Sequence, residues 1–217
     1  MNNNKILKIN EIFKSIQGES TAMGKPCAFV RLTYCNLRCS YCDTEYSFHE
    51  GKDMKIIDII EEVKSMNTNL VEITGGEPML QKNVIPLMNE FINNNFEVML
   101  ETCGAISLKD VPRKVKKIVD FKCPSSNMNH KNLWSIIDEL SPHDEIKFVI
   151  GDRVDYKWTL NKINQYNLDS RWTILFSPVF DSLKLEQLAD WILEDSLNVR
   201  LQLQMHKYIW DPDMRAV

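Results

Sequence analysis

The chain has 217 residues, of which 44% are hydrophobic, and it carries a formal net charge of −4. This length predicts one large domain, residues 1–217. The acidic balance argues against non-specific binding to nucleic acid. The start of the chain, Met1–Lys5, is polar, and no apolar stretch approaches the roughly 20 residues of a membrane span. We therefore expect a cytoplasmic protein that binds neither nucleic acid nor a membrane.

Segments rich in valine, isoleucine and phenylalanine alternate with longer segments of helical periodicity. The predicted strands are 6–13, 28–33, 70–74, 96–101, 117–121, 145–150, 173–177 and 199–203. The predicted helices are 54–66 with Asp53 as its cap, 84–94, 133–140, 154–166, and 183–193 with Ser182 as its cap. This alternation predicts an α/β fold with a parallel sheet. A complete eight-fold barrel needs about 250 residues, so we expect a partial, open (β/α) barrel with its site at the carboxyl ends of the strands.

Three cysteines follow the second predicted strand at the spacing C-x3-C-x2-C: Cys35, Cys39 and Cys42. Thiolates are soft ligands that favour iron–sulfur clusters, Cu(I) or zinc. A cubane cluster normally takes four cysteines, so three would leave one metal position open to another molecule. Asp43 and Thr44 follow directly and carry oxygen atoms of the kind that hard cations prefer.

A zinc site is the main alternative for these cysteines, and it would need a fourth ligand, for which His49 is the nearby candidate. The other cysteines, Cys27, Cys103 and Cys123, are expected to be small buried hydrophobic residues. Disulfides are not expected in a reducing compartment.

Four further features have both a structural and a functional interpretation. The two glycines of the segment TGGEP (74–78) let the backbone approach a ligand closely, although the segment taken alone is better explained as a turn before a helix. Gln17, Gly18 and Glu19 form a polar turn between two strands. Arg31 lies within an apolar strand and needs an anionic or carbonyl partner, from a ligand or from a structural ion pair. His206 follows the last predicted strand.

The cysteine segment and the TGGEP segment together resemble radical S-adenosylmethionine (SAM) enzymes, including the aromatic Tyr41 before the last cysteine. The resemblance implies a 4Fe-4S cluster on Cys35, Cys39 and Cys42, with SAM bound at the open iron. One electron from the cluster then cleaves SAM and releases a 5′-deoxyadenosyl radical. The glycine-rich segment is expected to bind the methionyl amino group through Gly75, Gly76 and Glu77.

Segments along nearly the whole chain resemble the 7-carboxy-7-deazaguanine synthase family. These are SIQGES (15–20), FVRLTYCNLRCSYCDT (29–44), EITGGEP (72–78), ETCG (101–104) and QLQMHKYIW (202–210). Enzymes of this family are lyases of queuosine and 7-deazapurine biosynthesis. They contract the ring of 6-carboxy-5,6,7,8-tetrahydropterin to 7-carboxy-7-deazaguanine with loss of ammonia. The radical removes hydrogen from C6 and later returns it, so no side chain is expected to act as a catalytic acid or base.

The resemblance also assigns roles to individual residues. Thr44 is expected to bind Mg²⁺ together with the substrate carboxylate. The nucleoside half of SAM is expected near Asp120, Phe121 and Lys122. The residues expected to bind substrate are Ile16, Gln17, Gly18, Glu19, Arg31, Thr74, His206 and Pro212.

The resemblance further implies a homodimer and a flavodoxin- or ferredoxin-type electron donor. Two other functions compete with this one. A glycyl-radical-enzyme activase would share the cluster loop but act on a protein, and Gln17–Glu19 and Arg31 argue against it because they suit a small heterocycle. A non-catalytic zinc-binding module would need no SAM at all.

Overall fold

The computed structural model describes residues 5–217, and its centre is one nine-stranded sheet in the order β3-β1-β2-β4-β5-β6-β7-β8-β9. The strands are β1 (Ile6–Ile16), β2 (Pro26–Leu32), β3 (Lys52–Lys55), β4 (Leu70–Gly75), β5 (Glu97–Thr102), β6 (Lys116–Asp120), β7 (Glu145–Ile150), β8 (Thr173–Pro178) and β9 (Arg200–Leu201). From β2 through β9 the neighbouring strands run parallel, whereas β1 is antiparallel to both β2 and β3. The predicted α/β fold with a largely parallel, open sheet is confirmed.

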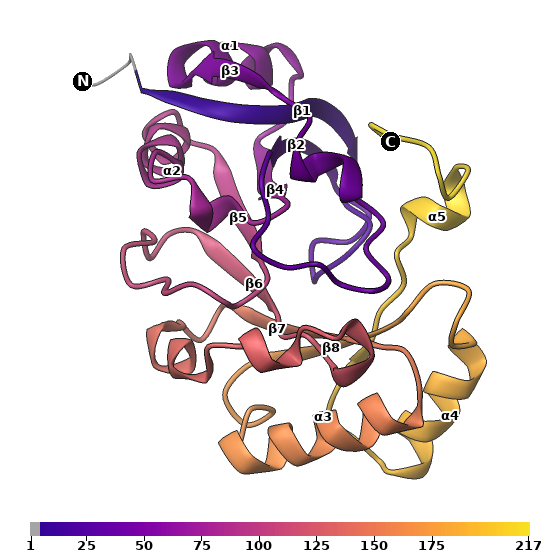
Figure 1. Cartoon of the computed structure of the whole chain (residues 1–217). Helices are drawn as coiled ribbons and strands as arrows, with labels where there is room; N and C mark the ends of the chain where they lie inside the picture. Colours follow the sequence, from indigo (N-terminus) through magenta and orange to yellow (C-terminus); the bar gives the residue numbers. More distant parts are fainter. Residues whose placement is uncertain (1–4) are drawn as a thin grey trace.

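Helices cover the outer face of this curved sheet (Figure 1). The α-helices are α1 (Ile56–Ser65), α2 (Val84–Asn93), α3 (Arg153–Tyr166), α4 (Leu185–Glu194) and the single turn α5 (His206–Ile209). The 3-10 helices are η1 (Glu45–Phe48), η2 (Pro78–Leu80), η3 (Pro124–Ser126), η4 (Asn129–Lys131) and η5 (Trp134–Glu139). The C-terminal segment with α5 lies on the opposite side from α2 (Figure 1). None of the helices in residues 5–217 combines the length and apolar character needed to cross a membrane.

The two faces of the sheet differ because successive side chains of a strand point to opposite sides. On the outer face, Val30, Ile73 and Leu100 pack with the helices in the main core. On the inner face, Phe29 and Met99 belong to a smaller apolar cluster near the amino ends of the strands. Polar residues replace the apolar ones on this inner face toward the carboxyl ends of the strands. The inner face is therefore apolar near the amino ends of the strands and polar near their carboxyl ends.

Three local expectations were wrong. Asp53 does not cap a helix, because residues 52–55 pair with β1 as strand β3 and Lys55 takes the N-cap position of α1. Lys184, not Ser182, precedes α4. Residues 134–139 form the 3-10 helix η5, whose buried side chains Ile136 and Ile137 are neighbours and do not follow the spacing of an amphipathic α-helix.

The antiparallel pairing of β1 places one predicted site segment at the opposite end of the sheet from the other predicted site segments. Ile16, the last residue of β1, pairs with Pro26, the first residue of β2. The loop between them, residues 17–25, therefore starts at the amino end of the parallel strands, whereas the other motifs follow parallel strands at their carboxyl ends. We call residues 17–25 the hairpin loop. Its anchor at the amino end is the carboxylate of Glu145, which accepts a hydrogen bond from the backbone N–H of Thr21.

A buried ion pair between Lys117 and Asp144 holds β6 on the outer, helix-covered face of the sheet. The Lys117 Nζ lies 2.8 Å from Asp144 Oδ2, and both side chains are buried. Replacing Asp144 with Asn should lower the free energy of unfolding by about 3 kcal/mol, because the lysine charge would then be buried without a partner. Urea denaturation followed by circular dichroism measures this change.

The matched control is Lys64→Ala, which removes the exposed pair with Glu61 in α1. It should change the unfolding free energy by less than about 0.5 kcal/mol. Equal effects of the two substitutions would contradict the importance of the buried pair.

Candidate active site

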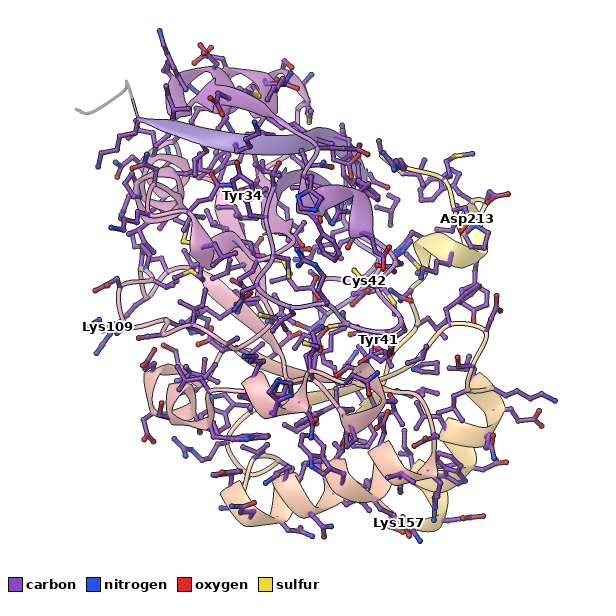
Figure 2. The ribbon with its side chains drawn as sticks, viewed as in Figure 1. Tyr34, Tyr41, Cys42, Lys109, Lys157 and Asp213 are labelled. Atoms are coloured by element: carbon purple, nitrogen blue, oxygen red, sulfur yellow. The ribbon has the colours of Figure 1, made fainter. Side chains whose placement is uncertain are left out.

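The three cysteines of the C-x3-C-x2-C segment lie on one loop that follows β2, and we call residues 34–44 the cluster loop. Cys35, Cys39 and Cys42 are each partly exposed, whereas Cys27, Cys103 and Cys123 are buried, as predicted. In Figure 2, Tyr41 and Cys42 lie toward the C-terminal segment, which carries Asp213. Lys109 and Lys157 lie away from them, at the outer edge of the molecule.

The cluster loop is fixed at several points. Leu37 is buried and serves as its apolar anchor. The Ser40 N–H donates to the carbonyl of Ser126 over 3.1 Å, and its hydroxyl donates to the carbonyl of Ser125 over 2.5 Å. Ser125 and Ser126 begin the crossover after β6, and the sequence analysis did not assign them a role. Their position after a buried strand, in a Pro-Ser-Ser turn, was the only available signal.

The donor chemistry of the loop fits an iron–sulfur cluster. Three soft sulfur ligands lie within eight residues, and the remaining thiols are enclosed in the core. Burial raises the pKa of Cys35, and it raises the pKa of Cys39 to about 11. Both thiols are therefore protonated at neutral pH and must release protons when they bind a metal. In residues 5–217 no group of three or more His, Cys, Asp or Glu side chains is placed close enough to hold a metal ion.

The glycine-rich segment after β4 packs directly against the cluster loop. A Cβ atom on Gly76 would lie 2.2 Å from the carbonyl oxygen of Tyr34 and 2.8 Å from the Cβ of Cys35, so only glycine fits. Glu77 is fully buried, and its carboxylate accepts hydrogen bonds from the Thr102 hydroxyl at 2.9 Å and the Cys103 N–H at 2.8 Å. This side chain therefore fastens the segment to the end of β5. The Glu77 N–H donates to the Tyr34 carbonyl over 2.7 Å and its carbonyl accepts from the Leu80 N–H over 3.2 Å, so a ligand could use only the second lone pair of this carbonyl.

The residues at the end of β6 divide between the two faces. Phe121 points to the outer core, where its ring stacks on Trp134 with centroids 4.4 Å apart. Asp120 and Lys122 pair with each other at 2.8 Å. The Asp120 Oδ1 and the Tyr41 hydroxyl are buried polar atoms without a hydrogen-bond partner in the described chain. The predicted nucleoside contact would therefore have to come from the Asp120 and Lys122 side chains and the Phe121 carbonyl, because the Phe121 N–H donates to the Lys147 carbonyl over 3.0 Å.

The hairpin loop brings Gln17 and Glu19 to the inner face of the sheet. Gln17 Nε2 donates to Glu72 Oε2 over 2.5 Å, and Gln17 Oε1 accepts from the Glu19 N–H over 3.0 Å. The Glu19 carboxylate is bound by Lys147 Nζ. The same ammonium group lies 2.7 Å from Glu101 Oε1. No site role was predicted for Glu72, Glu101 or Lys147. Glu72 and Glu101 begin the family segments EITGGEP and ETCG, which were the available signal, whereas Lys147 is a single charge inside an apolar strand and belongs to no motif.

Arg31 and Thr74 are neighbours in register on β2 and β4. Arg31 Nε donates to Glu11 Oε1 over 2.7 Å, and the Tyr46 hydroxyl donates to the same oxygen over 3.0 Å. The structural ion pair that the sequence analysis considered for Arg31 is thus present. It uses the Nε group, and a ligand contact through the other guanidinium nitrogens stays a prediction.

The C-terminal segment closes against the hairpin and cluster loops. The Met205 N–H donates to the carbonyl of Gly18 over 3.1 Å, and a Cβ on Gly18 would lie only 2.6 Å from His206 Nδ1. Burial and the neighbouring Lys207 charge lower the pKa of His206, so its imidazole is neutral at pH 7. Lys207 Nζ donates to Asp43 Oδ2 over 2.8 Å.

Thr44 and Pro212 differ in how the fold places them. Thr44 is half-buried at the end of the cluster loop, with its hydroxyl 3.8 Å from Cys42 Sγ. Pro212 is exposed on the tail, and no hydrogen bond in the described chain joins it to the other predicted site residues. A cavity of about 430 Å³ lies elsewhere, near the amino ends of β8 and β9, and includes none of these residues.

Comparison with known proteins identifies the family. Residues 30–192 match the family model of the radical SAM superfamily. The chain is 44% identical over 226 residues to the 7-carboxy-7-deazaguanine synthase of Koribacter versatilis (strain Ellin345), a match that covers 97% of this chain and 100% of that protein. It is 42% identical over 214 residues to the protein of the same name from Chlorobaculum tepidum, covering 97% of each.

The chain belongs to the 7-carboxy-7-deazaguanine synthase family of radical SAM proteins. Its fold also matches the crystal structure of QueE from Escherichia coli, with a TM-score of 0.78 and 22% identity over 93% of this chain and 95% of that one. Family membership implies a 4Fe-4S cluster and SAM. These relatives favour neither the activase nor the zinc-binding module.

The exposures of the six cysteines predict which of them hold iron. Cys103→Ala and Cys123→Ala should each keep about four irons per chain after anaerobic reconstitution, because these thiols are buried and lie outside the C-x3-C-x2-C segment. Cys39→Ala should lose most of its iron. Iron and sulfide analysis measures the difference, and loss of iron from either of the first two variants would mean that the ligands are assigned wrongly.

Proposed function

We propose that this chain converts 6-carboxy-5,6,7,8-tetrahydropterin to 7-carboxy-7-deazaguanine, as a radical SAM carbon–nitrogen lyase of 7-deazapurine biosynthesis. One observation carries the proposal beyond family membership: the loop with three partly exposed thiols adjoins an inner sheet face whose polar groups suit a small, polar heterocycle. Gln17, Glu19, Arg31 and Thr74 contribute to this face.

The protein and its cofactors divide the chemistry. When bound, the cluster and SAM supply the one-electron chemistry that breaks a carbon–hydrogen bond which no side-chain base could break at neutral pH. Cys35, Cys39 and Cys42 would hold the cluster. The residues of the inner face orient the substrate and exclude water, and none of them is required as a catalytic acid or base.

Substrate recognition falls to groups with the right hydrogen-bonding character. The Glu19 carboxylate can accept from the 2-amino group and the N3–H of a pterin, because an ionised carboxylate only accepts hydrogen bonds. Neutral His206 can donate or accept beside it. The side chains of Gln17, Arg31 and Thr74 complete the proposed contacts. Ile16, Gly18 and Pro212 remain proposed contacts that rest on the family resemblance.

The backbone of Gly75, Gly76 and Glu77 is proposed to bind the methionyl end of SAM. Close packing of Gly76 on Cys35 supports this, because it places backbone polar groups beside the cluster loop. Asp120 and Lys122, with the backbone of Phe121, are proposed to face the nucleoside. The orphan oxygen of Asp120 supports the assignment, since a buried acceptor without a partner is costly unless a ligand donates to it.

Thr44 is proposed to bind Mg²⁺ with the substrate carboxylate. The neighbouring Asp43 is less suited to this role because Lys207 already occupies its carboxylate. Although burial acts in the opposite direction, the Lys207 charge lowers the pKa of Asp43 and keeps the pair ionised. Magnesium retains several waters and few protein ligands, so one threonine oxygen suffices.

The proposed working form is a cytoplasmic homodimer that receives electrons from a flavodoxin- or ferredoxin-type protein. The homodimer and the electron donor come from the family resemblance, and the cytoplasmic location is the expectation drawn from the sequence above.

An anaerobic assay tests the proposed function. The reconstituted protein is incubated with 6-carboxy-5,6,7,8-tetrahydropterin, SAM, Mg²⁺ and a reductant, and the products are identified by mass spectrometry. We expect 7-carboxy-7-deazaguanine, with SAM returned intact. Deoxyadenosine without any deazaguanine would retain the radical chemistry and reject the pterin substrate.

The magnesium assignment predicts a specific defect. Thr44→Ala should bind iron normally and still cleave SAM reductively, but its turnover should no longer rise when Mg²⁺ is added. Thr68→Ala is the control, because its hydroxyl bonds the Pro26 carbonyl far from the cluster loop. Turnover of Thr44→Ala that rises with Mg²⁺ as in the unaltered protein would show that another group binds the ion.

A further inference from the structure

The ammonium group of Lys147 lies at the centre of the inner sheet face. Lys147 is on β7, and its side chain is 5% exposed. It is bonded to Glu19 of the hairpin loop and lies 2.7 Å from Glu101 Oε1 of β5. A third carboxylate oxygen, Asp120 Oδ2 of β6, lies 3.9 Å away. One ammonium therefore joins acidic groups from three separate elements.

This arrangement differs from an ordinary structural ion pair. Lys117 on the outer face has one carboxylate partner, Asp144, and both side chains are buried. Asp120 has its own partner, Lys122, at 2.8 Å. The carboxylates of Glu19 and Glu101 still outnumber the one ammonium of Lys147, and both keep accessible surface: 14% for Glu19 and 24% for Glu101. Excess buried carboxylates are costly unless further donors reach them. The exposed surface of this cluster is thus prepared to accept hydrogen bonds from a ligand.

The two accessible carboxylates are also held close together. Oxygens bonded to the same ammonium lie at most about 6 Å apart, twice the length of a hydrogen bond. Glu19 is fixed further by the side-chain amides of Gln202 at 3.3 Å and Gln204 at 3.2 Å. Burial raises the pKa of Glu101, and the Lys147 charge opposes this effect. The ammonium thus favours the ionised, purely accepting form of this carboxylate.

We infer that Lys147 is a positioning residue that holds Glu19 and Glu101 as a paired acceptor for the amino-substituted edge of a 2-aminopyrimidinone ring. This inference rests on the proposed function and adds to it a basis for specificity. Two adjacent N–H donors on one heterocycle edge match two adjacent carboxylates. A ring with oxygen in place of the 2-amino group would turn a carbonyl toward them and be rejected.

Binding of two fluorescent probes tests the inference. 6-Carboxypterin carries the 2-amino group, and 6-carboxylumazine has oxygen at that position. Each is titrated into the reconstituted, SAM-loaded, unreduced protein, and its fluorescence gives the dissociation constant. We expect the unaltered protein to prefer the pterin, and Lys147→Met to bind the pterin about 10- to 100-fold more weakly and to lose most of this preference.

Lys117→Met is the matched control, because it also removes a buried, paired lysine from a neighbouring strand. It should leave the affinity and the preference nearly unchanged. Lys147→Arg should restore part of both, since it returns a cation to the carboxylates. A Lys147→Met protein that binds the pterin with unchanged affinity and preference would overturn the inference.

Glu101→Gln provides a second test if Lys147→Met does not fold. This substitution replaces an acceptor with an amide, so the preference for the amino group should fall, and a preserved preference would again overturn the inference. Where both single variants fold, the double variant should lose little more affinity than either one, because the residues act as a unit. Failure of the unaltered protein to form product in the anaerobic assay would instead reject the proposed function itself.

Discussion

A buried ammonium needs carboxylate partners, and this requirement organises the inner face of the sheet. Lys147 draws Glu19 and Glu101 to one point and thereby ties the hairpin loop and β5 to β7. Gln17 and Glu72 make a second tie between this loop and β4. The contacts that form the polar part of the inner face are therefore the same contacts that hold the hairpin loop across the open side of the barrel.

The hairpin loop reaches the polar part of the inner face from the amino ends of the parallel strands, and the cluster loop reaches it from their carboxyl ends. Ser40 is bonded to the crossover after β6, and Gly76 packs against Cys35, so the thiols and the glycine-rich segment share one location. The C-terminal segment completes the enclosure through Lys207, which pairs with Asp43 of the cluster loop, and through His206, which packs on Gly18. A substrate between the two regions would touch groups supplied by both ends of the chain.

Much of this arrangement could be predicted from the sequence, and the remainder depends on tertiary contacts. The cysteine spacing and the glycine pair are local patterns, and both lie where the strand order places them. The antiparallel course of β1 was not predictable, because alternating strands and helices do not reveal the direction of the first strand. Lys147 could not be predicted as a site residue because a single charge within an apolar strand is uninformative until the partner strand is known. Glu101 begins the family segment ETCG, but the segment alone does not reveal what this side chain contacts. Glu77 fits the motif, yet its carboxylate is used within the fold.

The central claim is that the side chains of the inner face orient the substrate while hydrogen transfer belongs to the bound SAM. Substrate carrying deuterium at C6 tests this claim most directly. After anaerobic turnover, the account predicts deuterium in the recovered SAM and none in the product, because the carboxyl-bearing carbon of 7-carboxy-7-deazaguanine carries no hydrogen. Complete loss of the deuterium to water, with none in SAM, would contradict the account, because it would mean that a side chain removes this hydrogen as a proton.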